Sequence, residues 1–136
     1  MVFKRYSNCK IKIKISMTKE IYADPWKKIA ESWKLLTDGP HPSKKNVEQY
    51  KKFLDEVSKD VDSPKVVVFG STPEIRDMLA EYNNVSVTVL DINQEMTKAM
   101  TSLMKNKSDM EIWVEGNWLD PKLPEGEFDV VFGDHI

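Results

Sequence analysis

The stretch KVVVFGSTPEIRDML, residues 65–79, constrains the fold more than any other part of the sequence. Its first five residues, rich in valine, are typical of a strand buried on both faces, as the central strand of a parallel sheet is. The strand ends at Gly70, and Pro73 begins an amphipathic helical pattern almost at once. A buried strand joined to a helix by a short glycine loop predicts a nucleotide-binding type of α/β unit.

Short strands and helices alternate along the rest of the chain. The pattern predicts further strands at 85–91, 110–115 and 128–134, and helices at 73–82 and 94–105. This order predicts an α/β fold with a Rossmann-like, open and mostly parallel sheet whose crossovers are right-handed.

Two helices are predicted ahead of the sheet. Asp24 and Pro25 mark the start of the first, roughly residues 25–36, and Ser43 caps the second. Aromatic residues follow the apolar stripes of these helices, and two interpretations are open: they pack in the core, or they line a pocket. These residues are Trp26, Trp33 and Tyr50.

The first sixteen residues differ in composition from the rest. Residues 1–16 contain five Lys or Arg and no acid, and CKIKIKIS alternates Lys with Ile. This alternation fits an edge strand guarded by lysines or a tail ahead of Met17, and we expect a tail. The formal net charge of the whole chain is -2, which does not support binding to nucleic acid or to an acidic membrane surface. We divide the chain into this tail, a helical cap (17–62) and a core (63–136).

Cysteine and histidine usage excludes several kinds of site. Cys9 has no second cysteine to pair with, and His41 and His135 are far apart, so we expect neither an internal disulfide nor a metal site. No apolar run reaches the roughly 18 residues of a membrane span, and the N-terminus lacks a secretion signal. We therefore expect a cytoplasmic protein.

The loop after the first strand limits the ligand. Gly70 permits a positive φ and a close backbone approach, and Thr72 is placed to cap the next helix. A pyrophosphate needs several free amides and a glycine at each close approach, but Ser71, Thr72 and Pro73 stand there instead. An amino acid carried on a nucleoside makes smaller demands on such a loop.

Asp91 ends the second strand, about 21 residues after Gly70, where an acidic side chain accepts hydrogen bonds from both ribose hydroxyls. An Asp at a strand end can also cap the helix that follows. Together with the glycine loop, the position of Asp91 indicates a nucleoside site.

Four segments, in order, resemble the motifs of the class I S-adenosylmethionine-dependent methyltransferases, and more narrowly a group whose first motif is similar to FGSTPEIRDML. VVVFGSTPE resembles motif I, VTVLDINQEM motif II, VEGNWLD motif III and FDVVFGDHI motif IV. The resemblance runs from about Trp26 to the last residue. The two helices ahead of the sheet resemble that group's N-terminal cap, which packs over the cofactor.

The resemblance implies S-adenosylmethionine as cofactor and in-line transfer of its methyl group, with catalysis by positioning and desolvation. It places Gly70, Ser71 and Thr72 near the methionine part and Asp91 on the ribose. Further positions are implied near the adenine or the methyl group: Ile92, Met96, Asn117, Trp118, Gly133 and Asp134.

Several of these roles have alternatives. Asn117 stands where the family usually has an acidic residue that hydrogen-bonds the adenine amine. The side-chain carbonyl oxygen of Asn117 can accept the same hydrogen bond. Trp118 fits equally a hydrophobic plug under the loop, Asp134 a strand-end cap, and His135 a general base or an incidental residue. No (Asp/Asn)-Pro-Pro-aromatic signature follows the fourth strand, so methylation of DNA amino groups has no support. The methyl acceptor and the catalytic residue stay open.

The family's domain continues for three more strands, in the sheet order 3-2-1-4-5-7-6, whereas this sequence stops at Ile136. We expect FDVVF to be a sheet edge with Val130 and Phe132 in an exposed apolar patch, which implies either a fragment or a homodimer through this edge. Two other functions are open. One is a non-catalytic module in which the cofactor pocket or the bare fold serves assembly or regulation, and the other is a nicotinamide-dependent oxidoreductase, which the missing GxGxxG disfavours.

Overall fold

The computed structural model describes residues 28–36, 41–108 and 110–133. The predicted tail, the helix start at Asp24 and Pro25, and Trp26, Asp134 and His135 lie outside these residues. Residues 28–32 are helical. The elements that follow are η1 (Trp33–Leu35), α2 (Lys44–Val57), β1 (Lys65–Phe69), α3 (Pro73–Leu79), β2 (Ser86–Asp91), α4 (Gln94–Thr101), β3 (Glu111–Glu115) and β4 (Val130–Gly133).

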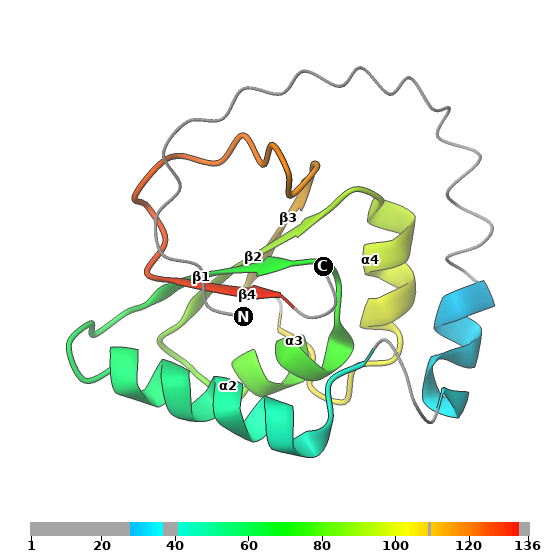
Figure 1. Ribbon diagram of the computed structural model, residues 1–136, viewed down its shortest axis with the longest axis horizontal. Coiled ribbons are helices and arrows are strands. Elements are labelled where there is room, and N and C mark those ends of the chain that lie inside the picture. The colour runs from blue at the N-terminus through cyan, green and yellow to red at the C-terminus, as the bar shows by residue number, and fades with distance from the viewer. Residues whose placement is uncertain (1–27, 37–40, 109, 134–136) are drawn as a thin grey trace.

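The four strands form one parallel sheet in the order β3-β2-β1-β4 (Figure 1). The predicted α/β fold with an open parallel sheet is confirmed. β1 is central, and its three valines, Val66 to Val68, are buried on both faces as their sequence predicts. The predicted helices at 73–82 and 94–105 extend beyond α3 and α4, because the chain leaves the helix in turns at residues 80–81 and 102–103.

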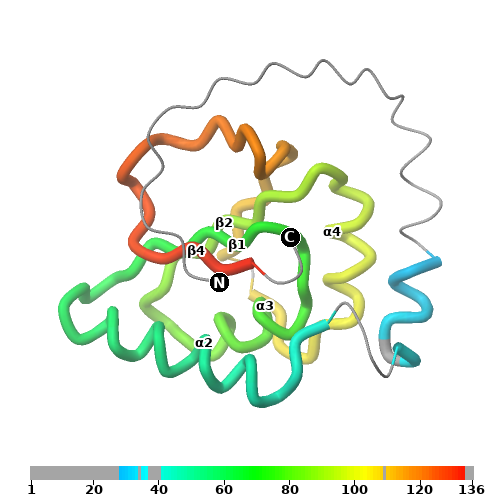
Figure 2. Tube along the Cα trace, viewed as in Figure 1, coloured from blue at the N-terminus to red at the C-terminus, as the bar shows by residue number. Residues whose placement is uncertain are grey.

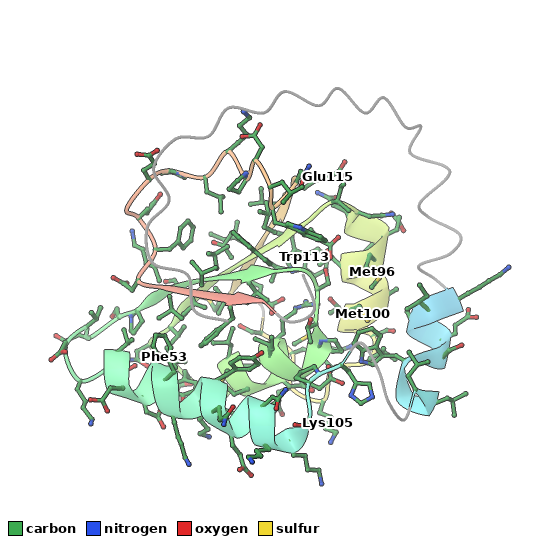
Figure 3. The ribbon with its side chains drawn as sticks, in the orientation of Figure 1. Phe53, Met96, Met100, Lys105, Trp113 and Glu115 are labelled. Atoms are coloured by element: carbon green, nitrogen blue, oxygen red, sulfur yellow. The ribbon has the colours of Figure 1, made fainter. Side chains whose placement is uncertain are left out.

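One hydrophobic core lies between the sheet and the helices α2 and α3. Leu54 of α2 is fully buried in it, and the cap of this helix is as predicted, since the Ser43 side chain accepts from the Asn46 backbone N–H at 3.2 Å. Figure 3 shows the Phe53 side chain on the same helix. Because α2 shares the core of the sheet, it is held by the same apolar burial that holds the strands.

The fourth strand differs from the prediction in one respect. β4 pairs only with β1 among the described strands, so it lies at an edge as expected. Val130 and Phe132, however, are each only 2% exposed, and the Phe132 ring centroid lies 5.4 Å from that of Tyr50 on α2. The prediction of an exposed apolar patch at these two residues is wrong, because α2 covers them. Tyr50 accordingly packs against the core.

A second, smaller cluster joins the helical segment 28–36 to α4. Ala30, Trp33 and Met100 are buried in it, and Met96 packs against them from the side of α4. The Trp33 indole also donates from Nε1 to Oε1 of Glu74, in the first turn of α3, at 3.0 Å. Figure 2 shows the segment beside α4. Trp33 therefore has a packing role, and it connects this segment to the helix that follows the glycine loop.

Candidate functional site

The loop between β1 and α3 has the backbone that its glycine predicts. Gly70 has a φ of 86°, a conformation that residues with a Cβ rarely adopt, and its N–H donates to the Leu90 carbonyl at 2.9 Å. A Cβ built at Gly70 would meet no atom within 4 Å, so the space next to it is open. Thr72 occupies the N-cap position of α3 but makes no capping hydrogen bond with its side chain, so that part of the prediction is wrong.

Ser71, Asp91 and Thr97 form a buried polar cluster at the carboxyl ends of β1 and β2. The Ser71 hydroxyl donates to Asp91 Oδ2 at 2.5 Å and lies 2.8 Å from Thr97 Oγ1. The three residues are 3%, 6% and 2% exposed. Because β1 and β2 are parallel neighbours, Ser71 and Asp91, 20 residues apart in the sequence, meet at one edge of the sheet.

The Asp91 carboxylate accepts hydrogen bonds on both of its oxygens from its own chain. Besides Ser71, the Asn93 backbone N–H donates to its Oδ1 at 3.0 Å. The N-cap of α4 is Asn93, whose side chain accepts from the backbone of residues 95 and 96. The alternative role of Asp91 as a helix cap is therefore wrong.

Burial raises the pKa of the Asp91 carboxyl above its ordinary value. Hydrogen bonds from the Ser71 hydroxyl and from the backbone of Asn93 and Ile92 oppose this change, and so does the charge of Arg76. Burying an ionised carboxylate costs free energy. Buried carboxyl groups with a shifted pKa are found at functional sites and also in structural polar networks.

Arg76 extends the polar cluster toward β3, and the sequence analysis missed it. This side chain is fully buried, donates from Nε and Nη2 to the two carboxylate oxygens of Glu111 at 3.0 and 2.6 Å, and approaches the Thr97 carbonyl at 3.5 Å. Its Cζ also lies 5.7 Å from the centroid of the Trp113 ring. A fully buried Arg requires a partner, but the helix in which Arg76 sits gives no sign of which acid supplies it.

The other predicted site residues that the structure describes follow β2, lie on α4, follow β3 or end β4. Ile92 follows Asp91 directly and is 44% exposed. Glu115 is in register with Asp91, and the Gly116 N–H donates to the Asp91 carbonyl at 2.9 Å, so β3 ends beside β2 (Figure 3).

Asn117 and Trp118 belong to the turn that follows β3. Asn117 is bridged to Asp120, its Oδ1 accepts from the Leu119 backbone N–H at 3.0 Å, and Trp118 is half-buried. Met96, which the resemblance places near the adenine, is partly buried and packs against the cluster of Ala30 and Trp33.

The described ranges contain no group of three or more His, Cys, Asp or Glu side chains that could hold a metal ion. None of the helices in this part of the chain combines the length and apolarity needed to cross a bilayer. In comparisons with known proteins, no family model, no curated protein and no solved structure matches the chain.

Proposed function

We propose that this protein binds S-adenosylmethionine as the cofactor-binding part of a methyltransferase whose acceptor is undefined. The observation that carries the proposal is the meeting of the Gly70–Ser71 loop with the Asp91 carboxylate at the carboxyl ends of β1 and β2. Ligands of open α/β sheets bind beyond these ends, and an acid at the end of the second strand accepts the ribose hydroxyls. The exposed Ile92 side chain next to it supplies an apolar surface suited to a base.

The start of α3 fits a cationic group better than a pyrophosphate. Pro73 has no N–H to offer an anion, and the Glu74 carboxylate lies in the first turn. One of its oxygens accepts from Trp33, while the other, Oε2, is buried and has no hydrogen-bond partner within the described part of the chain. S-Adenosylmethionine carries a sulfonium and an ammonium group, and it supplies an electrophilic methyl group when bound. This arrangement disfavours the alternative of a nicotinamide-dependent oxidoreductase.

A second candidate is a non-catalytic module that uses the fold alone. One observation favours it: protein donors already bind both oxygens of the buried Asp91 carboxylate, as in a structural polar network. Under this alternative the helical segment 28–36 and α2 serve packing, and self-association through β4 remains a prediction.

Calorimetric titration with S-adenosylhomocysteine and with NAD distinguishes the three functions. The proposal expects binding of S-adenosylhomocysteine and none of NAD. Asp91→Ala should weaken that binding by about 1.5 to 3 kcal/mol, because hydrogen bonds to a charged acceptor are lost. Binding of neither ligand by the folded wild-type protein would support the non-catalytic module, and binding of NAD alone the oxidoreductase.

A further inference from the structure

The hydroxyl groups of Ser71 and Thr97 form a short chain that ends on Asp91. Thr97 Oγ1 lies 2.8 Å from the Ser71 hydroxyl, which lies 2.5 Å from Asp91 Oδ2. At the other end, Thr97 Oγ1 lies 3.5 Å from the Asn93 carbonyl. Each hydroxyl is both a donor and an acceptor, so the two protons can point along this chain in either direction.

In one direction Thr97 donates to Ser71 and Ser71 donates to Asp91. In the other direction Ser71 donates to Thr97, Thr97 donates to the Asn93 carbonyl, and Asp91 Oδ2 is released. Both arrangements leave each hydroxyl proton with an acceptor, so reversal strands no buried donor. Asp91 Oδ1 accepts from the Asn93 backbone N–H at 3.0 Å, and this donor is fixed by the turn in which it lies. Ser71 is thus the partner that can rotate away.

We propose that Ser71 is an internal substitute for a ligand hydroxyl, and that the Ser71 hydroxyl turns from Asp91 to donate its hydrogen bond to Thr97 when a nucleoside binds. This inference rests on the proposed function, and it deepens it by naming two residues that set affinity for the ribose. A vicinal diol delivers two donors to one carboxylate, and Asp91 is too buried to accept them freely while Ser71 occupies Oδ2. Ser71 consequently competes with the ligand, which is the opposite of a direct contact to the methionine part.

The competition predicts opposite effects for the two hydroxyls. Ser71→Ala removes the competitor and should tighten binding of adenosine about fivefold, the equivalent of one ordinary hydrogen bond. Thr97→Val removes the alternative acceptor, holds Ser71 on Asp91 and should weaken binding about fivefold by the same reasoning. Thr97→Ser retains a hydroxyl and should bind as the wild type does.

The test is displacement of S-adenosylhomocysteine by adenosine and by 2′,3′-dideoxyadenosine, at pH 8, for the wild type and each variant. Ser102→Ala is the matched control, since this exposed hydroxyl donates only to the Ala99 carbonyl at the end of α4. Melting temperatures establish that each variant is folded, and the Thr97 pair provides the test if Ser71→Ala does not fold. The control should leave both affinities unchanged.

A gain in Ser71→Ala for adenosine but not for the dideoxy compound, with a loss in Thr97→Val that Thr97→Ser restores, supports the proposal. Unchanged or weaker adenosine binding by folded Ser71→Ala overturns it, and so does an equal gain for both compounds. If only the Thr97 pair folds, equal affinities of Thr97→Val and Thr97→Ser overturn it. Failure of the wild type to bind S-adenosylhomocysteine overturns the proposed function itself, a result that the variants cannot produce.

Discussion

The Arg76 guanidinium donates to both carboxylate oxygens of Glu111, at 3.0 Å from Nε and 2.6 Å from Nη2, and the two side chains are 0% and 4% exposed. This bidentate pair joins α3 to β3, the edge strand at the opposite end of the described sheet from β4. The Nη2 group also donates to the Thr101 hydroxyl at 2.7 Å on α4. One buried cation therefore connects both helices of the α/β units to the sheet.

Breaking this pair should be strongly destabilising. Glu111→Ala leaves the Arg76 charge buried without its partner, and the free energy of unfolding should fall by about 3 to 5 kcal/mol in urea denaturation. The exposed pair of Lys98 with Glu95, at 2.8 Å, is the matched control. Lys98→Ala should change the free energy of unfolding by less than about 1 kcal/mol. Similar losses in the two variants would contradict a special role for the buried pair.

Stability should depend on pH through Asp91. Burial raises the pKa of its carboxyl in the folded protein, so between neutral pH and the unfolded value of about 3.9 the folded state holds more protons than the unfolded state. The contribution of Asp91 to stability is therefore present at low pH and lost as pH rises through the raised pKa. Asp91→Asn removes this titration. Its unfolding free energy relative to the wild type should be highest near pH 7 and decrease toward pH 4.

Urea denaturation of both proteins across this pH range measures the difference. Asp62→Asn, at an exposed position, controls for the loss of one negative charge. A difference between Asp91→Asn and the wild type that stays constant from pH 4 to pH 7 would contradict the expected linkage.

The sequence was sufficient to predict the elements whose burial follows from a local pattern of apolar residues. The valine run of β1 and the glycine after it predicted a central strand and its loop, and the alternation of strands and helices predicted the parallel sheet. Contacts between side chains on different elements were beyond this reasoning. Arg76 and Glu111 are 35 residues apart, and no periodicity in either segment indicates that they pair.

Coverage of the sheet faces was equally hard to foresee. The apolar stripe of α2 predicts that this helix is buried on one side, but the stripe does not say which strand it covers. Phe132 was expected to be exposed because β4 is an edge strand, and it is buried because Tyr50 and Phe53 lie against it, with ring centroids 5.4 and 6.3 Å away. An edge position in the strand order does not imply an uncovered face.

A comparison of alanine substitutions at two glycines distinguishes the effect of backbone strain from the effect of ligand contact. Gly70 and Gly126 have φ values of 86° and 73°, and a Cβ at either would meet nothing within 4 Å. Alanine at either position should therefore cost a similar amount, about 1 to 2 kcal/mol, through backbone strain alone. Only Gly70→Ala should also weaken S-adenosylhomocysteine binding, because its Cβ occupies the open space beside the loop. Equal affinities of the two variants in calorimetry would place the ligand elsewhere.

The last prediction concerns the indole that connects segment 28–36 to α3. Trp33→Phe keeps an aromatic ring in the cluster of Ala30 and Met100 but removes the donor to Glu74, whose Oε2 is buried and has no partner among the described residues. The unfolding free energy should fall by about 1 to 3 kcal/mol, since both carboxylate oxygens then lack a hydrogen bond. Leu35→Ala, at a residue 78% exposed in the same segment, should stay within about 0.5 kcal/mol of the wild type. Glu74→Gln retains an acceptor for the indole and should cost less than Trp33→Phe. A Trp33→Phe protein as stable as the wild type in urea denaturation would show that packing alone holds this segment on α4.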